Sequence, residues 1–399
     1  MTVSPAPDPT PGVRPRHINL LANAAGSASI IFIPLYARQF AATNDQIGFI
    51  VASFNGFVLF ASFVFGRAAD LYGIRRFLRA GLALSAVAAL TQIVAHDPWT
   101  VALSRAFLGF TSGMFPAALL AYAKTADRLI GRFASLGSLG WAVGTLAAGF
   151  LDWISPGVLW PVFGFSAGLY FAGFLLSGGA PLAPEGRVRI PFLPVEVLRR
   201  NLPIYLSVLI RHTGANMVWV IFTLYLADIG RMSGLQIGIV FTLNPLVQFL
   251  VMRRTDRLSS GTLLATGLGL SAVTFLTFTV SADFAWILGT QVLLGVSWAT
   301  LYTGALRFIA EQNREMATAG GLLTGVLSVS SIIGPIAGGL LSSTQADLRA
   351  SYVVPMYAAG AMSLASLVAY LWARPAPAVP TRAPAARSSD SERGSGESP

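Results

Sequence analysis

Long apolar runs, each of about 18 to 26 residues and bounded by charges, proline or glycine, follow one another along most of the chain. A helix needs about 20 apolar residues to cross the hydrocarbon core of a bilayer. The runs predict six spans in the first half of the chain, at residues 17–40, 44–66, 77–95, 99–123, 131–152 and 157–177. They predict six more in the second half, at residues 203–227, 233–252, 262–282, 285–309, 317–343 and 351–373. We therefore expect an all-α membrane protein with twelve transmembrane helices.

Polar segments divide the chain into two six-helix bundles, a linker and two tails. The bundles are predicted at residues 17–177 and 203–374, with a charged linker at residues 178–202 between them. The tails, residues 1–16 and 375–399, are rich in proline and polar residues, a composition typical of disordered segments.

The two halves repeat each other in sequence. Residues 33–36 and the following Gln46-Ile47-Gly48 recur as residues 222–225 and Gln236-Ile237-Gly238. Arg105 on the fourth span corresponds to Gln291 on the tenth, 186 positions later. Six-helix units that repeat in the same orientation imply two pseudo-symmetric bundles, related by an axis along the membrane normal, with a binding cavity between them.

Composition agrees with a chain that lies mostly in lipid. Of the 399 residues, 54% are apolar and only 11% are charged, whereas soluble proteins carry about 25% charged residues. This leaves no room for a sizeable soluble catalytic domain. The chain has no Cys and only three His, and no serine-hydrolase motif, zinc-protease motif or carboxylate pair lies within a span. We expect no enzymatic activity, cofactor or metal site.

The positive charge follows the predicted topology. Of the 27 Lys and Arg residues, 22 fall in segments on one side of the membrane, and the other side holds only Arg38, Arg231 and Arg349. Short loops rich in Lys and Arg stay in the cytoplasm, so both termini are predicted to be cytoplasmic in a cytoplasmic (inner) membrane protein. The net charge of +10 therefore reflects topology and does not indicate nucleic-acid binding.

The loop between the second and third spans reads Gly66-Arg67-Ala68-Ala69-Asp70-Leu71-Tyr72-Gly73-Ile74-Arg75-Arg76. It resembles the cytoplasmic loop signature of the major facilitator superfamily, a family of twelve-helix secondary transporters. The resemblance implies a gating loop that helps to hold the outward-open state. Its candidate residues are Gly66, Asp70, Gly73, Arg75 and Arg76, with Asp256 as the counterpart of Asp70 in the second half.

Two further patterns resemble the same family. On the fourth span, Arg105 is followed by Gly109 and Gly113. On the fifth, the spacing of the glycines resembles a pattern that the family associates with exporters that exchange substrate for a cation. Small residues at such spacing let helix backbones pack closely. The candidate helix-packing residues are Gly140, Gly144 and Gly149, and in the second half Gly334, Pro335, Gly338 and Gly339.

Spans 1, 4, 7 and 10 line the central cavity in this superfamily, and each carries polar or aromatic residues at helical spacing. Hydrogen bonds between helices and aromatic packing are the alternative explanation for any single one of them. The candidate cavity residues are Asn19, Asn23, Arg105, Ser112, Arg211, His212, Asn216, Trp219, Gln291, Trp298 and Tyr302.

Charges within spans restrict the substrate. Burying a cation in lipid costs about 2.5 to 3.5 kcal/mol on insertion scales. For Arg105 we favour a functional role, whereas snorkelling explains Arg211 equally well. Every carboxylate falls in a predicted loop, a tail or the end of a span, so the cations favour an anionic or polar substrate. His212 is the side chain that could titrate near neutral pH.

These observations favour a monomeric secondary transporter that moves a small molecule by alternating access, with export preferred. A metabolite importer or facilitator of the same fold is the alternative, and a proton or another ion is a candidate for coupling. A non-transporting membrane sensor is a third hypothesis, although the predicted loops are short for one.

Overall fold

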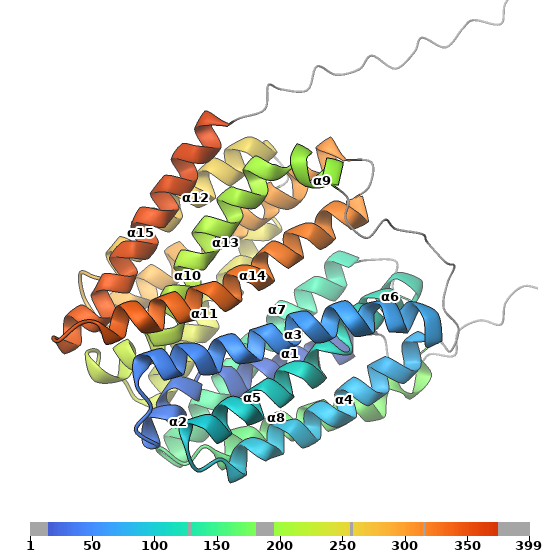
Figure 1. The fold of residues 1–399 in the computed structure, drawn as a ribbon, viewed down its shortest axis with the longest axis horizontal. Helices are drawn as coiled ribbons and strands as arrows, with labels where there is room; N and C mark the ends of the chain where they lie inside the picture. The colour runs from blue at the N-terminus through green and yellow to red at the C-terminus, as the bar shows by residue number, and fades with distance from the viewer. Residues whose placement is uncertain (1–14, 127–129, 181–194, 256–257, 314–315, 374–399) are drawn as a thin grey trace, which may run out of the picture.

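The computed structural model describes residues 15–126, 130–180, 195–255, 258–313 and 316–373, and all the regular elements in these ranges are helices (Figure 1). Among the described residues, eleven helical segments are long and apolar enough to cross a membrane. A further long helix, Ile130–Ile154, corresponds to the predicted fifth span. Tails 1–14 and 374–399 and most of the predicted linker lie outside the described residues.

The N-terminal half contains eight α-helices. They are α1 (Pro15–Ile30), α2 (Ile33–Gln39), α3 (Asn44–Tyr72), α4 (Ile74–Thr91), α5 (Pro98–Gly113), α6 (Pro116–Ala126), α7 (Ile130–Ile154) and α8 (Trp160–Leu176). The predicted first and fourth spans are each divided into two helices, at Ile31–Phe32 and at Met114–Phe115. Pro34 and Pro116 explain both breaks, because proline has no N–H to donate and its fixed φ suits the first turn of a new helix.

The C-terminal half begins with a short helix in the predicted linker and continues with six long ones. They are α9 (Val195–Arg200), α10 (Leu202–Asp228), α11 (Gly234–Met252), α12 (Ser260–Thr277), α13 (Phe284–Gln312), α14 (Met316–Ser343) and α15 (Leu348–Trp372).

The loop between α3 and α4 is a single residue. α3 extends to Tyr72, beyond the predicted end at residue 66, and α4 begins at Ile74 instead of 77. Gly73 lies between them with φ of 103°, a conformation that favours glycine, and its N–H donates to the Ala69 carbonyl at 3.0 Å.

The repeated Gln-Ile-Gly sequence has the same local role in both halves. The Gln46 side chain accepts a hydrogen bond from the backbone N–H of Thr43 at 3.0 Å, and Gln236 accepts from Ser233 at 2.9 Å. Each pair is a capping box at the start of a helix, α3 in one half and α11 in the other. The sequence repeat is therefore also a structural one.

The two halves contact each other through two equivalent helix crossings. α3 packs on α14, and α7 packs on α11. A Cβ added at Gly238 would lie 2.8 Å from the Cα of Gly149, and one added at Gly339 would lie 3.1 Å from the Cα of Gly48. Each crossing therefore requires a close backbone approach that a larger residue would prevent.

The other predicted packing glycines hold helices together within each half. A Cβ added at Gly144 would collide with α1 at Ala24 and Ser27, and one at Gly334 would collide with α10 at Thr213 and Asn216. Gly140 against Leu20 and Gly338 against Met217 are contacts of the same kind. The Pro335 carbonyl instead meets Gly48 across the halves, at the crossing of α3 and α14.

Polar contacts between the halves gather at the end of the molecule where α3 begins and α14 ends, which we call the closed end. Here the Arg38 guanidinium pairs with the Asp228 carboxylate and donates to the Tyr352 hydroxyl at 2.8 Å, and Tyr352 in turn donates to Asp228. The Asn44 amide donates to the Ser342 hydroxyl at 2.9 Å. We call Arg38, Asp228 and Tyr352 the latch.

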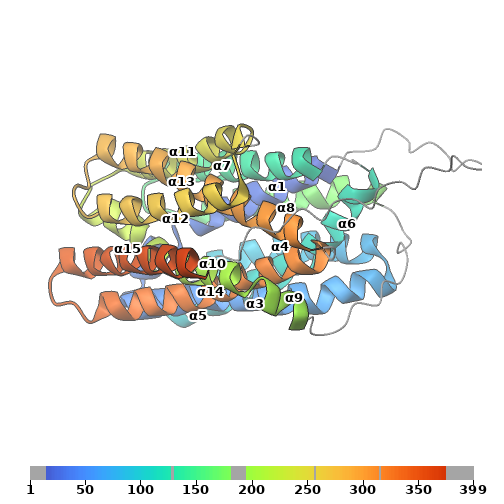
Figure 2. The same ribbon diagram turned by 90° about the horizontal axis from the view of Figure 1, so that it is seen from above.

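The opposite end, where α6 ends and α9 lies, we call the linker end. There the helices of the two halves diverge, with α15 and α6 far apart in Figure 1. Seen from above, the helices of both halves run along the long axis of the molecule (Figure 2). The cross-half hydrogen bonds formed by the described residues lie in the half of the molecule nearer the closed end, so the contact between bundles is one-sided.

Breaking the latch is expected to open the closed end. Asp228→Asn removes the carboxylate that Arg38 and Tyr352 share, a loss of about 1 kcal/mol, which corresponds to a roughly five-fold change in population. Because the chain has no Cys, spin labels at His96→Cys and Thr344→Cys report the separation of the halves without background labelling. Electron–electron distance measurements should show a larger fraction of long distances. Asp283→Asn, the same change in a helix cap of α13 outside the latch, is the control. Identical distance distributions for Asp228→Asn and the parent would contradict the assignment.

Candidate functional site

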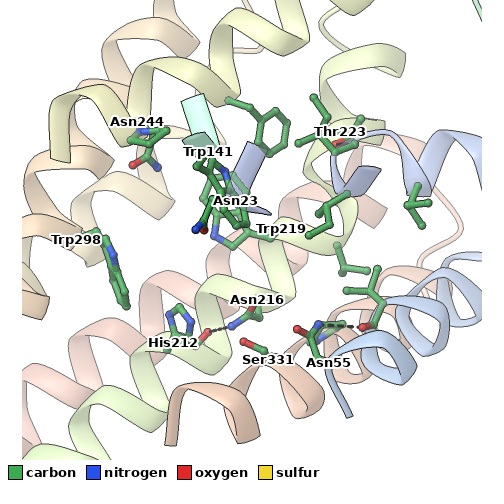
Figure 3. A pocket seen from close by; sticks show the side chains of 18 of the residues that line it. Asn23, Asn55, Trp141, His212, Asn216, Trp219, Thr223, Asn244, Trp298 and Ser331 are labelled. Atoms are coloured by element: carbon green, nitrogen blue, oxygen red, sulfur yellow. Dashed lines mark hydrogen bonds between the residues drawn. The ribbon is translucent and has the colours of Figure 1, made fainter. Parts of the chain in front are cut away.

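A cavity of about 680 Å³ lies between the two halves (Figure 3). Both halves contribute to its wall, through α1, α2, α3, α5 and α7 on one side and α10, α11, α13 and α14 on the other. In Figure 3, Trp298 and His212 lie together on one side, and Trp141, Trp219 and Asn23 lie on another. The volume is that of a site for a drug-sized molecule.

The cavity brings together all the predicted cavity residues except Ser112 and Tyr302. The Ser112 hydroxyl donates to the Gly109 carbonyl of its own helix at 3.2 Å. Tyr302 stacks on Trp298, with ring centroids 5.4 Å apart, and is half-buried outside the set of lining residues. The prediction for these two residues rested on helical spacing alone. Helical spacing shows which residues share a face of a helix, but not which of them are covered by side chains of neighbouring helices.

Several polar lining residues were missed by the sequence analysis. They come from α3, α7, α11 and α14, and include Asn55, Ser138, Trp141, Asn244, Gln248 and Ser331. The predicted cavity included spans 1, 4, 7 and 10 alone, and these residues lie on other spans. An amide within an apolar span was the signal that could have found Asn55, Asn244 and Gln248.

Arg105 is buried in the wall of the N-terminal half, with 2% of its surface exposed. Its Nη1 donates to Ser29 Oγ and Gln92 Oε1, both at 3.3 Å, and its guanidinium lies 4.1 Å from the centre of the Phe54 ring. The two hydrogen bonds and the cation–π contact thus stabilise the positive charge of Arg105. None of the three partner side chains carries a negative charge that would neutralise it.

Arg211 is buried to the same degree in the wall of the C-terminal half. Its Nε donates to Ser271 Oγ at 2.8 Å, and its guanidinium lies 5.1 Å from the centre of the Trp298 ring. The side chain does not reach the surface, so snorkelling does not account for it. Among the described residues that line the cavity there is no Asp or Glu, so none of these residues compensates the positive charge of the two arginines.

Both halves of the wall hold unpaired polar atoms, and most of these atoms belong to the C-terminal half. Within the described part of the chain, Arg211 Nη2, His212 Nδ1 and both amide atoms of Gln291 are buried without a hydrogen-bond partner, and Arg105 Nε is the corresponding atom in the N-terminal half. The asparagines nearby are different, since Asn23 donates to Asn19 and Asn216 donates to the His212 carbonyl, both at 2.8 to 2.9 Å. An unpaired buried group costs about 1 to 3 kcal/mol, so this cluster is expected to bind a ligand.

The predicted gating loop lies at the linker end, away from the cavity. A Cβ added at Gly66 would lie 3.4 Å from the Ala117 Cβ on α6, and Gly73 forms the turn described above. Arg75 and Arg76 lie in the first turn of α4. The Asp70 side chain and Asp256 lie outside the described residues, so the gating role stays a prediction.

Comparison with known proteins identifies the family. The family model described as Major Facilitator Superfamily matches residues 18–210 and 204–394, and the chain belongs to this family of transporters. The chain is therefore a multi-pass membrane protein.

Two curated relatives are resistance proteins. Quinolone resistance protein NorA of Staphylococcus aureus is 23% identical over 41% of this chain and 42% of its own length. Multidrug resistance protein MdtG of Salmonella paratyphi A is 29% identical over 54% of this chain and 57% of its own. The chain thus spans about half the length of these relatives.

Solved structures share the fold. The nucleoside transporter NupG has a TM-score of 0.73 at 12% identity, covering 90% of this chain and 97% of NupG. A bacterial homologue of the human lysosomal transporter Spinster, in an inward-facing and unoccupied conformation, has a TM-score of 0.70 at 14% identity, covering 91% and 98%.

Cysteine labelling should distinguish cavity residues from buried ones. Asn216→Cys places a thiol in the cavity, whereas Ser112→Cys places one in a buried wall, and the chain has no other Cys. Because thiol reactivity follows exposure, a membrane-impermeant thiosulfonate should label Asn216→Cys at least about ten times faster than Ser112→Cys. Labelling should be faster in inside-out than in right-side-out vesicles if the linker end is cytoplasmic. Equally slow labelling of both variants would mean that the cavity is closed to water.

Proposed function

We propose that the protein is a monomeric secondary active transporter that exports small organic anions across the cytoplasmic membrane by alternating access. The observation that carries the anion preference is the pair Arg105 and Arg211, one in each half of a cavity whose lining, as far as the structure describes it, includes no carboxylate. A negatively charged substrate would compensate both guanidinium groups, whereas a cationic one would be repelled and would leave them unpaired.

The shape of the molecule supports alternating access. The halves touch at one end and diverge at the other, and the cavity lies between them. If the basic loops mark the cytoplasmic side, the diverging linker end opens the cavity to the cytoplasm. An exporter collects its substrate from that side. The names of NorA and MdtG also support export.

Transport by purified protein in liposomes tests this proposal. A panel of organic anions, zwitterions and cations of similar size should show uptake only of anions, and Arg105→Ala should lower that uptake about tenfold, the equivalent of about 1.4 kcal/mol. Arg349→Ala removes an exposed arginine at the closed end and serves as the matched control.

Two results would count against the proposal. Transport of cationic dyes alone, unaffected by Arg105→Ala, would contradict the anion preference. Accumulation in right-side-out vesicles without accumulation in inside-out vesicles would identify an importer. Flux with and without a pH gradient should be measured in the same preparation, because it reports whether protons drive the transport.

A further inference from the structure

The Gln291 amide is the least expected feature of the cavity wall. It is completely buried in α13, yet neither Oε1 nor Nε2 has a hydrogen-bond partner. Gln248 on α11 lines the same cavity, but its amide nitrogen donates to the side-chain oxygen of Asn244. An apolar residue at position 291 would avoid the cost of two unpaired atoms. A ligand that pairs with both atoms explains why glutamine is there.

Arg211 is oriented so that part of its guanidinium stays free. Ser271 accepts from Nε, and the Ser271 hydroxyl is itself bonded to Ser297 at 2.7 Å and to the Gly267 carbonyl at 2.8 Å. This buried chain of hydrogen bonds fixes one edge of the guanidinium. Nη2 is left without a partner, as a charged donor in the cavity wall.

An aromatic stack adjoins these groups. The Trp298 ring stacks on Tyr302 at 5.4 Å and on His212 at 4.9 Å, with interplanar angles of 14° and 26°. The stack runs from Tyr302 through Trp298 to His212, and of these three rings Trp298 and His212 line the cavity. A planar aromatic ligand would extend such a stack by one ring.

We propose that the C-terminal half holds a subsite for an aromatic carboxylate that also carries a hydrogen-bond donor, such as a ring hydroxyl. The carboxylate accepts from Arg211 Nη2 and Gln291 Nε2, the hydroxyl donates to Gln291 Oε1, and the ring packs against the stack that ends at His212. Both a donor and an acceptor are required of the ligand because the Gln291 amide offers one of each. This inference rests on the proposed function and specifies its substrate class.

Binding to the purified full-length protein in nanodiscs tests the subsite. The probes are the isomeric hydroxybenzoates, benzoate, hydroxybenzyl alcohol and cyclohexanecarboxylate, measured by calorimetry. At least one hydroxybenzoate should bind about ten times more tightly than each of the other three probes. Arg211→Gln should lower that affinity about tenfold or more, since a hydrogen bond to a charged group is lost. Arg211→Lys, which keeps the charge but not the planar fork, should lose most of the same affinity.

Gln291→Leu separates a ligand-binding amide from a structural one. It should abolish the preference for hydroxybenzoate over benzoate and raise the melting temperature of the unliganded protein by about 2 °C, because two unpaired atoms are removed. Gln39→Leu is the matched control, because the Gln39 amide lies outside the cavity lining and donates to the Gly157 carbonyl at 2.7 Å; it should keep the preference and should not raise the melting temperature. A lower melting temperature with an unchanged preference in Gln291→Leu would overturn the role of Gln291.

The outcomes distinguish this inference from the proposed function. Equal binding of cyclohexanecarboxylate and hydroxybenzoate would overturn the aromatic subsite and leave anion export standing. Binding of aromatic anions that is insensitive to both Arg211 variants and to Gln291→Leu would place the subsite elsewhere. If no anion binds and organic cations do, both proposals fail.

Discussion

Close backbone contact at two equivalent helix crossings holds the two bundles together. Apolar surfaces gain little by meeting in a bilayer, since lipid tails are as apolar as leucine, so helices associate through tight packing and hydrogen bonds. Gly149 meets Gly238 at one crossing, and Gly339 meets Gly48 at the other. Because both close approaches lie toward the closed end, the tightest contact is one-sided. Such an interface allows one bundle to rotate against the other, as alternating access requires.

Helix α10 joins the closed end to the candidate subsite. It carries Arg211 in the cavity wall and Asp228 in the latch, 17 residues apart, or about 26 Å along the helix. Between them, the Thr223 hydroxyl donates to the Ile31 carbonyl of the other half at 2.7 Å. A substrate that binds Arg211 therefore contacts the same helix, α10, that carries the latch residue Asp228 at the closed end. Through α10, substrate binding in the cavity can change the population of the state in which the latch is formed.

The fold was predictable because the bilayer constrains it so strongly. Apolar run lengths, the distribution of arginine and the internal repeat each depend on that constraint, and together they gave the helices and the two halves. The helix breaks before Pro34 and Pro116 were not predicted, because the length of an apolar run does not show where a helix is interrupted within it. α3 extends beyond its predicted end because charged residues past the hydrocarbon core were assigned to a loop, although a helix can continue through them.

The site was predictable only in part, because a stripe of polar residues on one helix does not show which side chains of neighbouring helices cover it. Arg105 and Arg211 were singled out as buried charges, but their partners Gln92 and Ser271 lie on other helices and follow no sequence pattern. Nor could the sequence distinguish the paired Gln248 from the unpaired Gln291. The halves match in sequence, yet the repeat places Gln291 where the first half has Arg105. Each half holds an unpaired guanidinium nitrogen, Arg105 Nε or Arg211 Nη2, but this asymmetry gives the second half the unpaired amide by which the proposed subsite would distinguish one anion from another.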